Sequence, residues 1–128
     1  MAERRVELVD EDGRITISED VLAAIARFAS EKVPGAARQT RGTAVGIMSI
    51  FGGEDLSPVI RTDLDEKGVH VELRIVVEYG YPVHEVAQGV QLSVRADVEE
   101  IAGIPVTGVD VLVRKVVPPQ IARRNAGG

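Results

Sequence analysis

The sequence contains no cysteine and no tryptophan, and aromatic residues account for only 3% of its 128 residues. Without cysteine the chain has no disulfide framework, no thiol nucleophile and no cysteine-based zinc site. It has two histidines, which is a poor basis for a zinc site. With so few aromatic side chains, the core has to be built from Val, Ile, Leu and Ala.

Long apolar runs are missing as well. No segment approaches the roughly 18 consecutive apolar residues of a membrane span, and the charged stretch 1–12 lacks the apolar run of a secretory signal. A chain of this length is typical of one domain that buries a core of its own. We therefore expect a soluble, cytoplasmic protein.

Acidic residues exceed basic residues by 20 to 15, and the excess is unevenly distributed. Residues 63–100 carry nine acidic and three basic side chains, whereas residues 114–128 carry four basic side chains and no acidic one. An acidic body argues against a nucleic-acid-binding domain, which normally presents a basic face. The basic end, with Arg114 and Lys115, is either a flexible solubilising tail or a contact for anionic lipid or an acidic partner.

Periodic patterns begin after the charged N-terminal stretch. Residues 13–18, "GRITIS", alternate like a short strand that opens with a glycine turn. The apolar spacing over 19–33 predicts an amphipathic helix, which Pro34-Gly35 stops. The following residues 36–41 are either a short edge strand or a loop.

Residues 59–78 predict a β-hairpin with a charged turn at 65–68. Its second strand alternates over 69–78, with valine, leucine and isoleucine on the buried side. His70, Glu72 and Arg74 lie on the other side, and we regard them as candidate partner contacts.

From Val83 the apolar period changes to that of a helix, which Gly103 ends. The stretch 106–117 alternates again as a last strand, with Gly108 at a possible bulge. The predicted fold class is α+β: a two-layer sandwich with two amphipathic helices on one face of a small mixed sheet. The predicted order is strand, helix, optional strand, two hairpin strands, helix, strand.

This order predicts a simple domain organisation. A flexible acidic N-terminus spans residues 1–12, a single α+β domain spans residues 13–117, and a flexible basic tail spans residues 118–128.

The segment 42–58, "GTAVGIMSIFGGEDLSP", is too short to span a membrane and too apolar for an ordinary loop. It is either a short helix that covers the core or a flap that exposes apolar surface to a partner. Its candidate contact residues are Val45, Ile47, Met48, Ile50 and Phe51.

His84-Glu85 is half of an H-E-x-x-H zinc-protease helix, but Gln88 stands where the second histidine is needed. His70 faces out from a strand and would need further ligands nearby to build a metal site. No phosphate-binding glycine loop and no G-x-S-x-G motif is present. We therefore predict no catalytic residue, no metal and no cofactor.

Three stretches together resemble the alkaline-shock-protein family of small bacterial cell-envelope stress-response proteins. They are "GRITISEDVLAAIARFASEKVPGA", "VHVELRIVVEYGYPVHEVAQGVQLSV" and "VEEIAGIPVTGVDVLVRKV", which together extend over about residues 13–117. The resemblance implies a non-enzymatic cytoplasmic protein that reaches the envelope through partners or self-association. The sequence departs from the family pattern in 42–56, where many members have a more polar linker.

These observations lead to a hypothesis of a scaffold or interaction protein of envelope stress. It would act through protein–protein contacts near the membrane, with self-association and a membrane-anchored protein as partners. The alternative is a small-ligand- or nucleic-acid-binding module that uses the sheet face, although we expect no nucleic acid. A hydrolase built around His84 and Glu85 is the least favoured interpretation.

Overall fold

A computed structural model describes residues 5–38 and 55–119 of the chain. The N-terminal elements are strands β1 (Arg5–Asp10) and β2 (Gly13–Ser18) and helix α1 (Glu19–Glu31). The later elements are listed together: β3 (Val59–Asp65), β4 (Gly68–Glu78), α3 (Val83–Asp97), the π-helical turn η1 (Val98–Ala102) and β5 (Val106–Val117).

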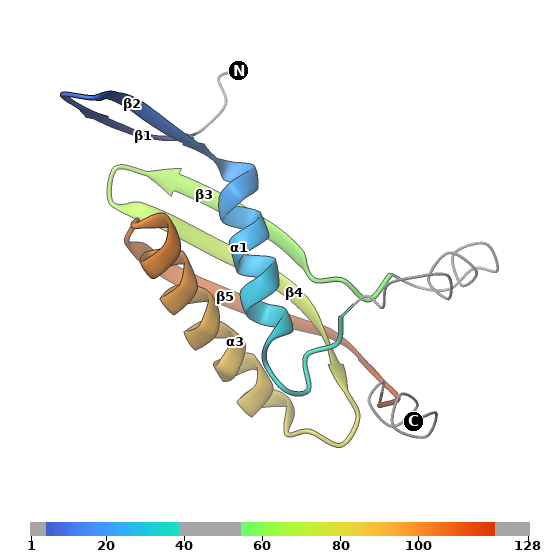
Figure 1. The fold of residues 1–128 in the computed structure, drawn as a ribbon. Helices are drawn as coiled ribbons and strands as arrows, with labels where there is room; N and C mark the ends of the chain where they lie inside the picture. The colour runs from blue at the N-terminus through green and yellow to red at the C-terminus, as the bar shows by residue number, and fades with distance from the viewer. Residues whose placement is uncertain (1–4, 39–54, 120–128) are drawn as a thin grey trace.

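The main sheet has three strands in the order β3-β4-β5. β3 and β4 form an antiparallel hairpin, and β5 pairs with β4 in parallel. Both α1 and α3 lie on one face of this sheet (Figure 1), so the helices form one layer and the sheet the other. The predicted α+β class is therefore confirmed.

The core lies between these two layers. The buried side of β4 contributes Val69, Val71, Leu73, Ile75 and Val77, each no more than 2% exposed. Helix α3 meets them with Val86, Val90 and Val94, and Val98 continues the same line into η1. The spacing of four residues places these side chains on one side. Full burial of such a side chain contributes about 1.5–3 kcal/mol. This aliphatic packing therefore determines which face of the sheet turns toward the helices.

The N-terminal segment differs from the prediction. Residues 1–12 were predicted to be flexible, yet Arg5–Asp10 forms β1 and pairs with β2 along its whole length. Strand β2 consequently belongs to a separate two-stranded sheet and not to the main one. The reason is an apolar match: Val6 lies opposite Ile17 and Leu8 opposite Ile15.

The hairpin turn, the end of η1 and the β-bulge each lie at or next to a glycine. Gly68 closes the β3–β4 hairpin opposite Asp65, and Gly103 ends η1 in the left-handed conformation with φ +72°. The β4–β5 register shifts between Val69 and His70, which places Thr107 in a bulge next to Gly108. Within the ambiguous stretch 36–41, Ala36 makes an isolated bridge to Val77.

Candidate functional site

The face of the main sheet opposite the helices is the candidate site, and we call it the outer sheet face. It exists because side chains alternate along β4: the odd-numbered ones enter the core, and His70, Glu72 and Arg74 point the other way. The structure therefore brings these three predicted contact residues together on one surface. Glu72 and Arg74 are exposed, and His70 is half-buried.

The strand register arranges the outer sheet face in rows. One row joins Arg61, Glu72 and Asp110 across the three strands, and the next joins Asp63, His70 and Gly108. A third row joins Val59, Arg74 and Leu112. Acidic and basic side chains alternate within short distances, so the face has no single sign of charge.

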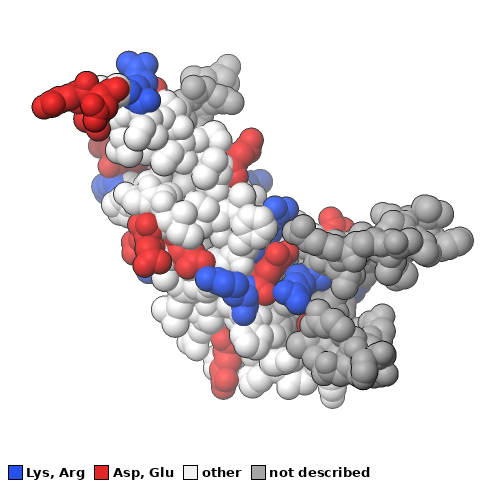
Figure 2. Space-filling view, in the orientation of Figure 1, with Lys and Arg blue, Asp and Glu red and all other residues white. Residues whose placement is uncertain are grey.

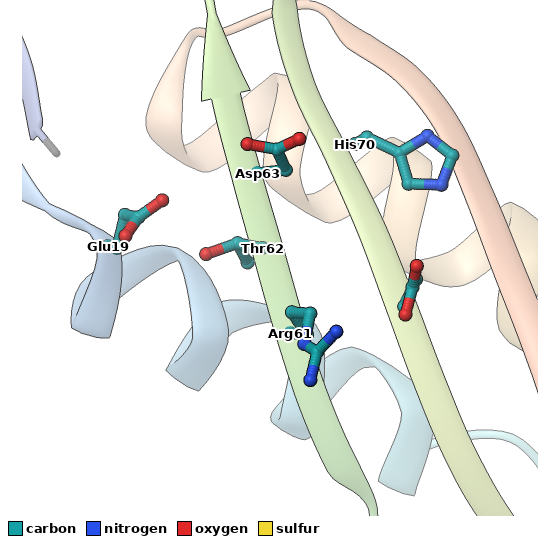
Figure 3. Close-up of a pocket in the computed structure, with 6 residues that line it drawn as sticks. Glu19, Arg61, Thr62, Asp63 and His70 are labelled. Carbon is teal, nitrogen blue, oxygen red and sulfur yellow. The ribbon is translucent and has the colours of Figure 1, made fainter.

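His70 and Asp110 form the tightest polar contact on this face. Their Nε2 and Oδ2 atoms are 2.8 Å apart. Gly108 leaves room for the ring, because a Cβ atom at that position would lie 3.1 Å from His70 Nδ1 and 3.2 Å from Cε1, so the ring would have to shift slightly. The ring therefore lies over a residue without a side chain, and it points toward β5 (Figure 3).

An open depression of about 350 Å³ begins at His70 and Glu72 and continues over β3 to the start of α1. Its other lining residues are Glu19, Arg61, Thr62 and Asp63. In Figure 3, Arg61, Thr62 and Asp63 lie on β3, and Glu19 lies at the adjacent end of α1. Glu19 is the first residue of α1, and its Oε2 atom is buried without a hydrogen-bond partner among the described residues. The depression is thus polar, with acids on both sides of Arg61.

The two basic contact candidates lie farther along β5. Arg114 donates a 3.0 Å hydrogen bond to the backbone oxygen of Asp55. Hydrogen bonds from the backbone and side chain of Ser57 lower the pKa of the Asp55 carboxyl, and the positive charge of Arg114 adds to this shift. Lys115 is half-buried in β5. The apolar candidates Val45, Ile47, Met48, Ile50 and Phe51 lie outside the described residues.

His84 and Glu85 are both exposed in the first turn of α3. An acid at this position is favoured by the positive end of the helix dipole. The part of the chain that the structure describes brings no second histidine to this turn. The half-motif is therefore explained by helix initiation.

Two features of the surface were not predicted from the sequence. Asp110 and Gly108 become partners of His70 only through the β4–β5 register. The second feature is the hairpin of β1 and β2, which projects from the body of the molecule (Figure 1). Figure 2 shows acidic side chains at the tip of this hairpin, where the turn contains Asp10, Glu11 and Asp12.

The hairpin has one apolar side, and its outer half is not covered. Val6 and Ile17 pack against the core at the base, whereas Leu8 and Ile15 are 52% and 57% exposed. The alternation of Val6 with Leu8 and of Ile15 with Ile17 was the available signal. It was weak because each run is only a few residues long.

Among the described residues, the fold is a two-layer α+β domain whose helices cover one face of the main sheet, with a hairpin that projects from it. Residues 7–118 match the family model of the alkaline shock protein 23 family, described as having a cell envelope-related function. The chain belongs to this family, so the resemblance noted in the sequence is confirmed. The family description names no reaction.

Similar proteins occur in bacteria. The chain is similar to the uncharacterized protein YloU of Bacillus subtilis, with 28% identity over 113 residues that cover 87% of this chain and 94% of the relative. It is also similar to YqhY of the same organism, with 24% identity and coverage of 77% and 73%. Among solved structures, it is similar to a triply substituted MamM CTD, with 14% identity, a TM-score of 0.47 and coverage of 76% and 94%.

Within residues 5–38 and 55–119, none of the helices is both long and apolar enough to cross a membrane.

Proposed function

We propose that the protein is a non-enzymatic scaffold of the cell envelope that works through protein–protein contacts, including contacts between its own copies. The family description supplies the link to the envelope. The observation that carries the proposal is the pair of exposed apolar side chains, Leu8 and Ile15, on a projecting hairpin. Adjacent exposed apolar residues favour a contact site more than apolar residues scattered singly do, and Leu8 and Ile15 are neighbours across the two strands.

A hairpin of two strands is only marginally stable by itself in water. Among the described residues, β1 pairs with β2 and its other edge has no strand beside it. A second hairpin placed against this edge would create a four-stranded sheet and satisfy the edge backbone groups. The structure therefore suits a two-fold contact in which each copy presents the same surface.

The expected affinity is modest. Pairing through the β1 edge places Leu8 of each copy at the contact, and burying its exposed part in both copies contributes about 2 kcal/mol. This term alone corresponds to a dissociation constant of about 30 mM. Backbone hydrogen bonds between the two β1 edges add to it. We therefore expect self-association that depends on concentration, which suits a scaffold that assembles where it accumulates.

The remaining contact candidates suit a second partner. His70, Glu72 and Arg74 lie on the outer sheet face, and Arg114 and Lys115 follow on β5. A protein anchored in the membrane is the partner we propose for these residues, which would hold the scaffold at the cytoplasmic side of the envelope. The alternation of acids and bases on this face gives less support to nucleic acid as a ligand, because phosphate backbones select a basic surface.

Size-exclusion chromatography with light scattering tests self-association. We expect the wild-type mass to rise with concentration and Leu8→Asp to remain monomeric, because a charge would be placed in the apolar contact. Val9→Asp is the matched control, since Val9 is 68% exposed in the same strand but faces the other side of the hairpin. A monomeric wild type, or equal effects of both substitutions, would contradict the proposed contact.

The membrane partner requires a separate experiment. We expect the wild-type chain to co-purify with a membrane protein, and a double variant, Arg74→Ala with Arg114→Ala, to lose it while still self-associating. If the hairpin variant loses the membrane protein and the double variant keeps it, the assignment of this partner to the sheet face is wrong.

A further inference from the structure

The outer sheet face places one imidazole and two carboxylates close together. His70, Glu72 and Asp110 each offer a ligand atom, and these atoms all lie within 4.8 Å of one another. We propose that these three residues form a binding site for a divalent transition-metal ion of the zinc class. The site is independent of the hairpin contact proposed above, because it lies on a different element.

The distances suit capture of a metal after small side-chain movements. Zinc bonds to imidazole nitrogen and carboxylate oxygen are about 2.0–2.2 Å long, so ligand atoms around a tetrahedral zinc lie about 3.3 Å apart. Nε2 of His70 and Oδ2 of Asp110 are 2.8 Å apart in a hydrogen bond, which the metal would replace as the two atoms move slightly apart. Rotation of the Glu72 side chain, which is exposed on the same strand, can close the remaining distance.

The backbone holds two of the three ligands in register. Glu72 and Asp110 are direct partners across the β4–β5 ladder, and His70 is two residues before Glu72 on the same face. Strand positions are rigid compared with loops, which lowers the entropy lost on binding. Gly108 lies under the His70 ring and keeps the space open for it. The bulge at Thr107 therefore matters to the site, because it sets Gly108 opposite His70.

The ligand chemistry selects the class of metal. One nitrogen and two oxygen ligands are typical of zinc and similar transition metals. Calcium and magnesium prefer sites made entirely of oxygen atoms. The carboxylates of Glu72, Asp110 and of Asp63 beside His70 favour a cation, and the guanidinium of Arg61, opposite Glu72, offsets part of this attraction. Three protein ligands leave a fourth position for water.

This proposal departs from the expectation that the chain holds no metal. That expectation considered His84-Glu85, which lacks a second ligand on its helix, and noted that His70 would need further ligands. The fold supplies them from β4 and β5. The chain contains no cysteine and two histidines in all, so His70 and His84 are its only side chains with a nitrogen or sulfur ligand suited to zinc.

Calorimetric titration of the full chain with Zn²⁺ tests the site. We expect one ion to bind per chain, with a large excess of Mg²⁺ failing to compete. His70→Ala, Glu72→Gln and Asp110→Asn should each weaken binding by at least about tenfold. His84→Ala and Glu85→Gln are matched controls from the other histidine–acid pair and should bind as the wild type does. Circular dichroism checks that each variant is folded.

A fourth variant tests the role of geometry. Gly108→Ala keeps all three ligands but places a methyl group against the His70 ring, so we expect weaker Zn²⁺ binding by about tenfold. In a proton NMR titration, Zn²⁺ should shift the ring signals of His70 and leave those of His84 in place. No saturable binding, or binding that survives His70→Ala and is lost in His84→Ala, would overturn the proposal.

Discussion

The hydroxyl group of Ser93 on α3 donates a hydrogen bond of 2.8 Å to the carbonyl oxygen of Ala29 on α1. Ala29 lies in the last turn of α1, where carbonyl groups lack the usual donor four residues later. The amide of Val33, which would be that donor, bonds to Ser30 instead. The contact therefore satisfies a helix-end carbonyl and joins the two helices.

Removing this hydroxyl should loosen the helix pair. We expect Ser93→Ala to lower the free energy of unfolding by about 1–2 kcal/mol, since Ala29 is buried and its carbonyl would lose a partner. Urea denaturation measures the change. Leu92→Ala is the control from the neighbouring position, because Leu92 is 70% exposed and should change stability by less than about 0.5 kcal/mol. Equal effects at both positions would show that the hydrogen bond is not the cause.

A methyl group at Gly68 should destabilise the domain more than one at Gly13. Both glycines have positive φ, +144° and +134°, so alanine is strained at each by about 1–3 kcal/mol. At Gly68 the new Cβ would also overlap the carbonyl oxygen of Pro105, whereas at Gly13 nothing lies within 4 Å. We expect Gly68→Ala to cost about 1–3 kcal/mol more through overpacking. Thermal unfolding of both variants compares them, and similar losses would contradict the close approach.

Glu99 should be needed to hold the start of β5. Its Oε2 atom accepts a 3.0 Å hydrogen bond from the amide of Val106, and Arg95 donates one of 2.7 Å to the carbonyl of the same residue. We expect Glu99→Ala to cost about 1–2 kcal/mol, because Val106 is buried and its amide would lose this acceptor. Hydrogen exchange at Val106 measures the local effect. Glu100→Ala, an exposed neighbour, is the control and should leave this exchange rate unchanged.

The lowered pKa of Asp55 predicts a small dependence of stability on pH. Because the folded pKa is below the ordinary value, the ionised carboxyl stabilises the fold above that value, and this contribution is lost as the pH falls through the lowered pKa. The contribution is small because the group is exposed. In an NMR titration, we expect Ser57→Ala to raise the pKa of Asp55 more than Arg114→Ala does, since the side-chain hydrogen bond outweighs the charge. The reverse order would mean that Arg114 dominates.

Much of the main domain could be predicted from local patterns. The alternation over Val69–Val77 extends over more than five residues, and the valine stripe of α3 extends over more than two helical turns. Each pattern is long enough to identify the buried side of its element. Gly103 ends the helical segment because glycine readily adopts the left-handed conformation at a helix C-terminus, and its position is visible in the sequence. The hairpin of β1 was harder to predict, because short strands flanked by charges depend on a partner strand for their stability.

The candidate site was only half visible for a similar reason. His70, Glu72 and Arg74 share a side because they alternate on one strand, and this follows from the sequence. Asp110 is 40 residues from His70 along the chain, and the pair depends on a parallel register with a bulge. A shift of that register by one residue would move Asp110 to the other face.

By itself, the sequence determined which side of each long element is buried, since burial of apolar area follows the local period of the chain. It also determined the family, because the order and spacing of the predicted elements can be read from the sequence. Only the tertiary structure decided that β2 pairs with β1 outside the main sheet and that His70 meets Asp110. Such pairings depend on competition between distant strands for backbone hydrogen bonds and apolar partners, and no local pattern encodes the outcome.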